Sequence, residues 1–269
     1  MSLLLTRRSV LVGAGAAFIV PKARLVRAAP LGLGTPPRGL EYPAGRAPGF
    51  DPTHPAARNA RASAVARPGG AMVNILTGTA LVNNASVVAQ TLAIGPAVQL
   101  LVVSATACSL STTFSEGSAV ITTMATITKI NSVPSNGNLF VSYVGTGYVQ
   151  LVTNNAGQLG VWMGSAYTLS GITLGTTSPY FIAASVYPGA SGLVHFILVN
   201  MATGAVQTAF NVATTKTTGT ITSPVFSVGS TGSTQAGMST ATAMLSVVGL
   251  SPAQLSAWAA DPWGFWYPN

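Results

Sequence analysis

Side chains able to carry out catalysis are few in this chain. Glycoside cleavage needs two carboxylates about 5 to 10 Å apart, and from Pro68 onward the only acidic residues are Glu116 and Asp261, far apart in sequence. No serine lies in a G-x-S-x-G motif, and the only histidines are His54 and His195. These observations predict that the chain is not an enzyme.

Metal and cofactor sites are not predicted either. Cys108 is the single cysteine, which excludes an internal disulfide and a cysteine-cluster metal site. Its apolar surroundings in the sequence predict a small buried side chain. The segment VGAGAA at 12–17 is similar to a dinucleotide-binding loop, but Phe18 occupies the position of the third glycine and no strand precedes the segment. We therefore expect no cofactor.

Charge is sparse and uneven. Only 6% of the 269 residues are charged, against roughly 25% in an ordinary domain. The net charge of +8 belongs to residues 1–67, because Lys129 and Lys216 balance Glu116 and Asp261 in the rest of the chain. A nucleic-acid-binding domain needs basic residues gathered on a folded face, so nucleic acid is not expected to bind the body. Weak phosphate contact by the basic N-terminal residues is the alternative that this charge leaves open.

The elements that would position a site begin near residue 71. Short runs rich in Val, Ile, Thr and aromatic residues are separated by turn signals such as Asn136-Gly137 and Pro188-Gly189. The strands predicted from these runs are Met72–Val82, Ala97–Cys108, Ala119–Ile130, Leu139–Val144, Tyr148–Val152, Leu159–Met163, Tyr180–Tyr187, Leu193–Val199, Val206–Val212, Val225–Val228 and Ala243–Val248. Antiparallel strands without intervening helices predict an all-β, two-sheet sandwich.

The alternation of residue types predicts how two of these strands are covered. Thr122, Thr126 and Thr128 share one face of Ala119–Ile130, which predicts a half-exposed strand. Leu193–Val199 is apolar on both faces apart from His195, so we expect it to be covered on each side.

One short C-terminal helix is predicted. Ser251, Pro252 and Gln254 form the pattern of a capping box with proline in the first turn, and the helix should end before Pro262. The four aromatic residues of the following tail, 263–269, are expected either to plug the end of the sandwich or to contact a neighbour or ligand.

The N-terminal segment resembles an export signal. The pair Arg7-Arg8 precedes a Gly- and Ala-rich apolar run of about a dozen residues, whereas a membrane span needs about 20. The pattern is similar to a twin-arginine signal, and no transmembrane span is expected. We therefore expect three parts, which are a twin-arginine-like signal or basic tether at 1–29, a Pro/Gly/Arg-rich linker arm at 30–70, and the sandwich at 71–269.

Both ends of the body resemble phage and prophage structural proteins. The motifs are GFDPTHPAA at 49–57 with MVNILTG at 72–78, and GLSPAQL at 249–255 followed by Asp261-Pro262-Trp263 and Phe265. The second motif resembles the close of concanavalin A-like (laminin-G-like) domains in such proteins. The resemblance implies an antiparallel jelly-roll sandwich and a role on a particle or in surface attachment.

Two hypotheses for function follow. The first is a non-catalytic structural or attachment component of a phage or prophage particle, partnered by other particle proteins or by copies of itself and located on the virion. The second is an exported lectin-like protein, periplasmic or secreted through the twin-arginine route. A cell-surface glycan is a candidate partner in both. A sandwich of the resembled kind would bind sugar through aromatic and polar side chains, and the candidates are Trp162, Tyr143, Tyr148 and Tyr167, each equally compatible with a core or ordinary surface position.

Overall fold

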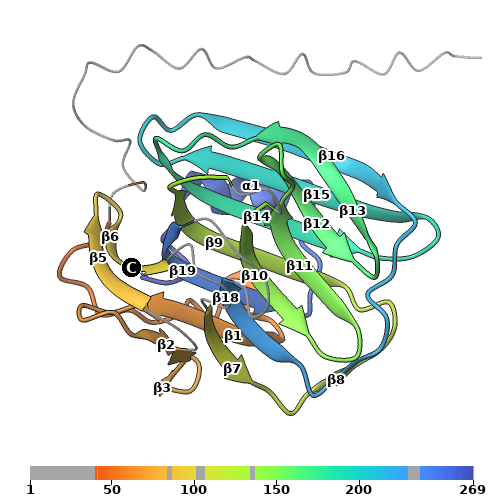
Figure 1. Cartoon of the computed structure of the whole chain (residues 1–269), viewed down its shortest axis with the longest axis horizontal. Coiled ribbons are helices and arrows are strands. Elements are labelled where there is room, and N and C mark those ends of the chain that lie inside the picture. Colours follow the sequence, from red (N-terminus) through yellow and green to blue (C-terminus); the bar gives the residue numbers. More distant parts are fainter. Residues whose placement is uncertain are drawn as a thin grey trace, which may run out of the picture. The chain divides into compact units, whose positions relative to one another are not determined.

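The computed structural model describes residues 40, 42–83, 87–100, 107–133, 137–229 and 237–268 (Figure 1). The predicted export pair Arg7-Arg8, and with it the whole signal or tether at 1–29, lies outside these residues. The described part contains β-strands, one α-helix, α1 (Pro252–Ala260), and one short 3-10 helix, η1 (Pro55–Ala57).

Two large antiparallel sheets make up the fold, one of ten strands and one of seven. The larger sheet runs β16-β15-β14-β9-β19-β1-β2-β3, with β6 also pairing β19 and β5 pairing β6. Its strands are β1 (Ala60–Ala66), β2 (Met72–Asn74), β3 (Thr79–Ala80), β5 (Val87–Leu92), β6 (Gly95–Leu100), β9 (Thr122–Ile130), β14 (Pro179–Tyr187), β15 (Gly192–Asn200), β16 (Val206–Thr214) and β19 (Met238–Ser246).

The smaller sheet runs β13-β12-β11-β10-β18-β7-β4. Its strands are β4 (Val82–Asn83), β7 (Ala107–Ser111), β10 (Leu139–Val144), β11 (Tyr148–Thr153), β12 (Gln158–Met163), β13 (Ala166–Thr173) and β18 (Val225–Gly229), while β8 (Ser115–Glu116) and β17 (Ile221–Thr222) form a separate ribbon. The predicted two-sheet antiparallel sandwich with one short C-terminal helix is confirmed.

Alternate side chains of the two sheets form the core between them. In β14, Ile182, Ala184 and Val186 point into this core, whereas Phe181 and Ala183 point to the opposite face of the sheet. The period of two follows from strand geometry, in which successive side chains point to opposite faces.

The predicted half-exposed strand is wrong. β9 lies between β14 and β19 and is buried on both faces from Thr122 to Thr128. The neighbouring strand β19 accepts from two of its threonine hydroxyls, because Thr126 Oγ1 donates to the Thr242 carbonyl at 2.7 Å and Thr128 Oγ1 donates to that of Ser239 at 3.1 Å. The buried Thr122 Oγ1 has no hydrogen-bond partner among the described residues. Hydrogen-bonded threonines can line a buried face, so their polarity did not indicate exposure.

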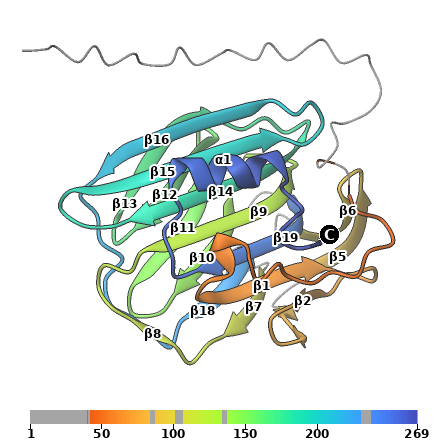
Figure 2. The same cartoon turned by 180° about the vertical axis from the view of Figure 1, so that it is seen from behind.

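The outward face of the ten-stranded sheet is covered by α1 and the tail that follows it (Figure 2). The predicted capping box is present: Ser251 Oγ accepts from Gln254 N at 3.3 Å, and Gln254 Oε1 accepts from Ser251 N at 2.9 Å. The tail lies on the face of the sheet, where Trp266 is fully buried and its Nε1 donates to Ser63 Oγ at 3.1 Å. We call this surface the covered face, and it leaves the tail aromatics no contact for a ligand.

Residues 42–70, which we expected to belong to a linker arm, contribute to the same layer. Gly49 N donates to the Trp266 carbonyl at 3.0 Å and Asp51 N to the Phe265 carbonyl at 2.9 Å. β1 then enters the sheet between β19 and β2. These two hydrogen bonds to the C-terminal tail, together with β1, place residues 49–66 in the folded body rather than in a separate arm.

Candidate functional site

Three of the four predicted ligand-binding aromatics come together on the outward face of the seven-stranded sheet. Trp162 Nε1 donates to Tyr148 Oη at 2.9 Å, and the Trp162 and Tyr167 rings meet edge to face with centroids 4.3 Å apart. Val161 and Met163 point into the core, so Trp162 between them must point outward. We call Tyr148, Trp162 and Tyr167 the aromatic trio.

Tyr143 does not share this face. It pairs with Val149 across β10 and β11 and is fully buried between the sheets, and this burial raises the pKa of its phenol. A ligand on the outward face would therefore not reach it.

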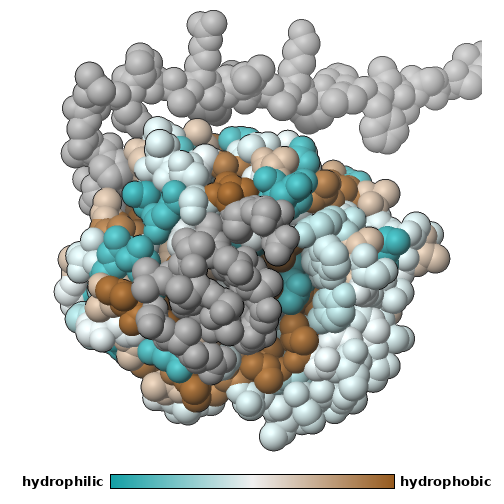
Figure 3. Space-filling model, viewed as in Figure 1, coloured by the Kyte–Doolittle hydropathy of each residue, from teal (hydrophilic) through white to brown (hydrophobic). Residues whose placement is uncertain are grey.

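The trio is only partly covered. Tyr167 and its neighbour Leu169 each remain 36% exposed, while Trp162 and Tyr148 are half-buried. Partial burial raises the pKa of Tyr167, which keeps its hydroxyl protonated and able to donate. The surface over β11, β12 and β13 is pale in Figure 3, which marks intermediate hydropathy. Such a surface offers both apolar ring area and hydrogen-bonding groups.

A groove adjoins the trio where the two sheets meet at β13 and β16. Its volume is about 320 Å³, and it is lined by Tyr167, Thr168, Leu169 and residues 212–216. Thr168 Oγ1 donates to Thr214 Oγ1 at 2.9 Å across the junction. We call it the trio groove.

The connection from β16 to β17 is fixed beside the trio. The Thr218 carbonyl accepts from Tyr148 N at 2.8 Å, and the Lys216 carbonyl accepts from Gly189 N at 3.0 Å. Gly147 allows this approach, because a Cβ at that position would collide with the Thr218 carbonyl oxygen. Lys216 is thereby held at the edge of the trio groove, although the sequence analysis did not single it out.

A second groove, of about 450 Å³, lies between η1 and α1. Asp51, His54, Trp258 and Asp261 are among its lining residues. A hydrogen bond from the Thr53 hydroxyl lowers the pKa of Asp51, and burial lowers the pKa of His54 to about 4. Two carboxylates therefore share a groove that sequence reasoning missed, because Asp51 was assigned to a linker.

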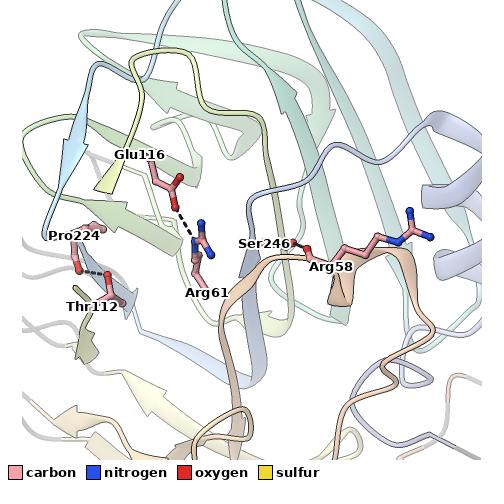
Figure 4. A network of polar contacts seen from close by, with 6 residues as sticks. All are labelled: Arg58, Arg61, Thr112, Glu116, Pro224 and Ser246. Carbon is pink, nitrogen blue, oxygen red and sulfur yellow. Dashed lines mark hydrogen bonds and ion pairs between the residues drawn. The ribbon is translucent and has the colours of Figure 1, made fainter. Parts of the chain in front are cut away.

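The remaining polar residues of interest have structural contacts. Glu116 Oε1 accepts from Arg61 Nε at 2.7 Å in the ion pair drawn in Figure 4, and Glu116 does not line the groove that contains Asp261. His195 Nδ1 accepts from Asn211 N at 3.0 Å. Cys108 is fully buried, which raises the pKa of its thiol to about 12.

A third cavity, of about 850 Å³, is mainly apolar. It lies beside β6 and is lined by Leu40, Tyr42, Leu92, Ile94 and Met201 among others.

The acidic, histidine and cysteine side chains are scattered over the part of the chain that the structure describes. No group of three or more His, Cys, Asp or Glu side chains gathers there in a way that could hold a metal ion. In the same residues, no helix has the length and apolar character needed to span a bilayer.

No protein-family model and no curated protein sequence matches this chain. Several solved structures share its fold. The binding domain of Paraclostridial Mosquitocidal Protein 1 superposes with a TM-score of 0.55 at 9% identity, covering 75% of this chain and 52% of that one. Trypanosoma rangeli sialidase in complex with sialic acid gives a TM-score of 0.50 at 12% identity, covering 78% of this chain and 34% of that one.

A third similar structure is domain 4 of AbnA, a GH43 extracellular arabinanase from Geobacillus stearothermophilus, in complex with arabinotriose. It gives a TM-score of 0.47 at 13% identity, covering 65% of this chain and 82% of that one. This chain spans about half of the mosquitocidal domain and a third of the sialidase. At such identities the likeness concerns the fold alone.

The prediction that the chain is not an enzyme is contradicted. The sialidase contains a region with this fold, so the architecture does not separate binding modules from enzymes. Carboxylates are also less scarce in the folded body than predicted, because Asp51 belongs to it and shares a groove with Asp261.

Proposed function

We propose that this chain binds carbohydrate through the aromatic trio. The observation that carries the proposal is the arrangement of Tyr148, Trp162 and Tyr167 on an outward sheet face beside a groove. Sugar rings present apolar C–H faces that pack on aromatic rings, and their hydroxyls exchange hydrogen bonds with polar side chains at the edge. The sialidase that shares this fold was solved with sialic acid, which is consistent with such a use.

Titration calorimetry of the full chain with a panel of oligosaccharides tests the proposal. Tyr167 is the most exposed ring of the trio, so Y167A should weaken binding at least tenfold, equivalent to about 1.4 kcal/mol. F114A is the matched control, because Phe114 is also an exposed aromatic, at 42%, and belongs to neither the trio nor its groove. Equal affinity in Y167A and the unsubstituted chain would contradict the proposal.

We further propose that glycan binding serves attachment of a phage or prophage particle, with export of a lectin-like protein as the alternative. The resemblance of residues 49–57 and 249–265 to phage structural proteins supports the first, and the Arg7-Arg8 pair supports the second. N-terminal peptide mass spectrometry on particle and periplasmic fractions separates them. A start at Met1 or Ser2 in particles would establish a virion component and contradict export, and a start near Ala29 or Pro30 in the periplasm would establish export.

A further inference from the structure

Charged side chains are scarce around the candidate site, which makes Lys216 conspicuous. From Pro68 onward the chain carries two lysines and two acidic residues. Glu116 pairs with Arg61, and Asp261 lines the groove between η1 and α1. Lys216 lines the trio groove together with Tyr167.

The position of Lys216 is fixed by its backbone. Its carbonyl accepts from Gly189 N at 3.0 Å, and its N–H donates to Thr214 Oγ1 at 3.2 Å. Two residues further on, the Thr218 carbonyl accepts from Tyr148 N at 2.8 Å. The lysine therefore lines the groove beside Tyr167 on a connection that is also bonded to Tyr148, and its flexible four-carbon stem gives the ammonium reach over the groove.

Among the residues that the structure describes, no carboxylate pairs with the Lys216 ammonium. The Arg61–Glu116 pair is the single salt bridge found among the described residues, and no carboxylate lines the trio groove. Lys216 is half-buried, and a partly desolvated cation gains from an anion brought by a ligand more than a fully hydrated one does.

We infer that the trio groove recognises an acidic sugar, one that carries a carboxylate or a sulfate. The sugar ring would pack on Tyr167 and its anionic group would contact the Lys216 ammonium. This inference rests on the proposed carbohydrate binding and adds the class of sugar. One ammonium pairs with either anion, so the two sources of charge are separated by experiment.

The test uses ligand pairs that differ only in charge. Trigalacturonic acid is compared with its methyl ester, and a sulfated galacto-oligosaccharide with its desulfated form, all titrated calorimetrically into the full chain. At least one acidic ligand should bind five- to tenfold more tightly than its neutral counterpart, and added salt should reduce that difference. The pair that shows the difference identifies the anion.

The variants K216Q and K129Q complete the test. K216Q should abolish the preference for the acidic ligand and leave the neutral ligand unchanged, while K129Q, on β9, should behave like the unsubstituted chain. A preference that survives in K216Q, or equal binding of acidic and neutral forms, would overturn the inference and leave carbohydrate binding intact. Absence of binding by all four ligands, together with no effect of Y167A across the wider panel, would overturn the proposed function itself.

Discussion

The two outward faces of the sandwich both carry tryptophan and tyrosine, but these residues are buried on one face and partly exposed on the other. On the covered face Trp258, Trp263, Trp266 and Tyr267 lie under or within the C-terminal layer and none is more than 3% exposed. On the opposite face the aromatic trio meets solvent, with Tyr167 at 36%. The difference shows that an aromatic residue on a sheet face becomes a ligand candidate only when no other segment of the chain covers it.

The largest expected effect lies on the covered face. W266A removes a fully buried indole and leaves Ser63 Oγ without its donor, so the free energy of unfolding should fall by about 3–5 kcal/mol. Urea denaturation followed by circular dichroism measures the change. The molecules that remain folded should bind sugar as before, and a loss of affinity in them would show that the two faces are coupled.

Lowering the pH should also destabilise the protein mainly through residues of the covered face. The His54 ring packs edge to face against Trp258 and Phe265, with centroids 4.7 and 5.3 Å away, and its pKa falls to about 4 because burial disfavours the imidazolium. The folded pKa lies below the usual value of 6.5. Stability should therefore be complete above pH 6.5 and decrease as the pH falls toward 4.

The expected loss is about 1–2 kcal/mol after allowing for partial exposure of the ring. Urea midpoints between pH 7 and pH 4 measure it. H54N keeps a side chain able to cap η1 and should remove most of the decrease in stability between pH 7 and pH 4. The smaller decrease that remains would come from His195, because burial also lowers the pKa of that residue. An unchanged slope in H54N would assign the acid sensitivity to other groups.

A matched pair of substitutions gives the smallest effect and the sharpest comparison. W162F removes the hydrogen bond to Tyr148 on a half-exposed face and should cost less than about 1 kcal/mol, because water can replace the partner. W266F removes the equivalent donor from buried Ser63 and should cost about 1–3 kcal/mol. Equal costs in thermal and urea unfolding would mean that both faces exclude water to the same degree.

Local signals in the sequence predicted those elements that depend on local chemistry. The capping box fixed the start of α1 at Pro252, and turn signals placed the hairpin of β14 and β15. β1, β5 and β13 were missed, as were the two-residue strands β8 and β17. The Ala-rich β1 is a strand because β19 and β2 pair with it on both sides, and tertiary pairing of this kind overrides strand propensity.

The candidate site likewise has one part that local sequence signals predicted and another part that depends on tertiary structure. Aromatic residue type selected three residues that lie together on one sheet face, but it could not distinguish Tyr143, whose direction depends on strand register. The trio groove forms where β13 and β16, edge strands of different sheets, pack against each other. Lys216 lies in the lining of this groove for the same reason. Residues more than 40 positions apart in the chain, such as Thr168 and Thr214, are brought together there, and no spacing in the sequence encodes this.

The hydrogen bonds that join residues 49–63 to the C-terminal tail have a consequence for biosynthesis. Trp266 and Ser63 are 203 positions apart, so the layer over the ten-stranded sheet is assembled from segments that leave the ribosome at widely separated times. Until the tail emerges, Phe181, Ala183 and the other apolar side chains of that sheet face have no cover. The nascent chain should therefore depend on chaperones late in translation, when most strands are already available to pair.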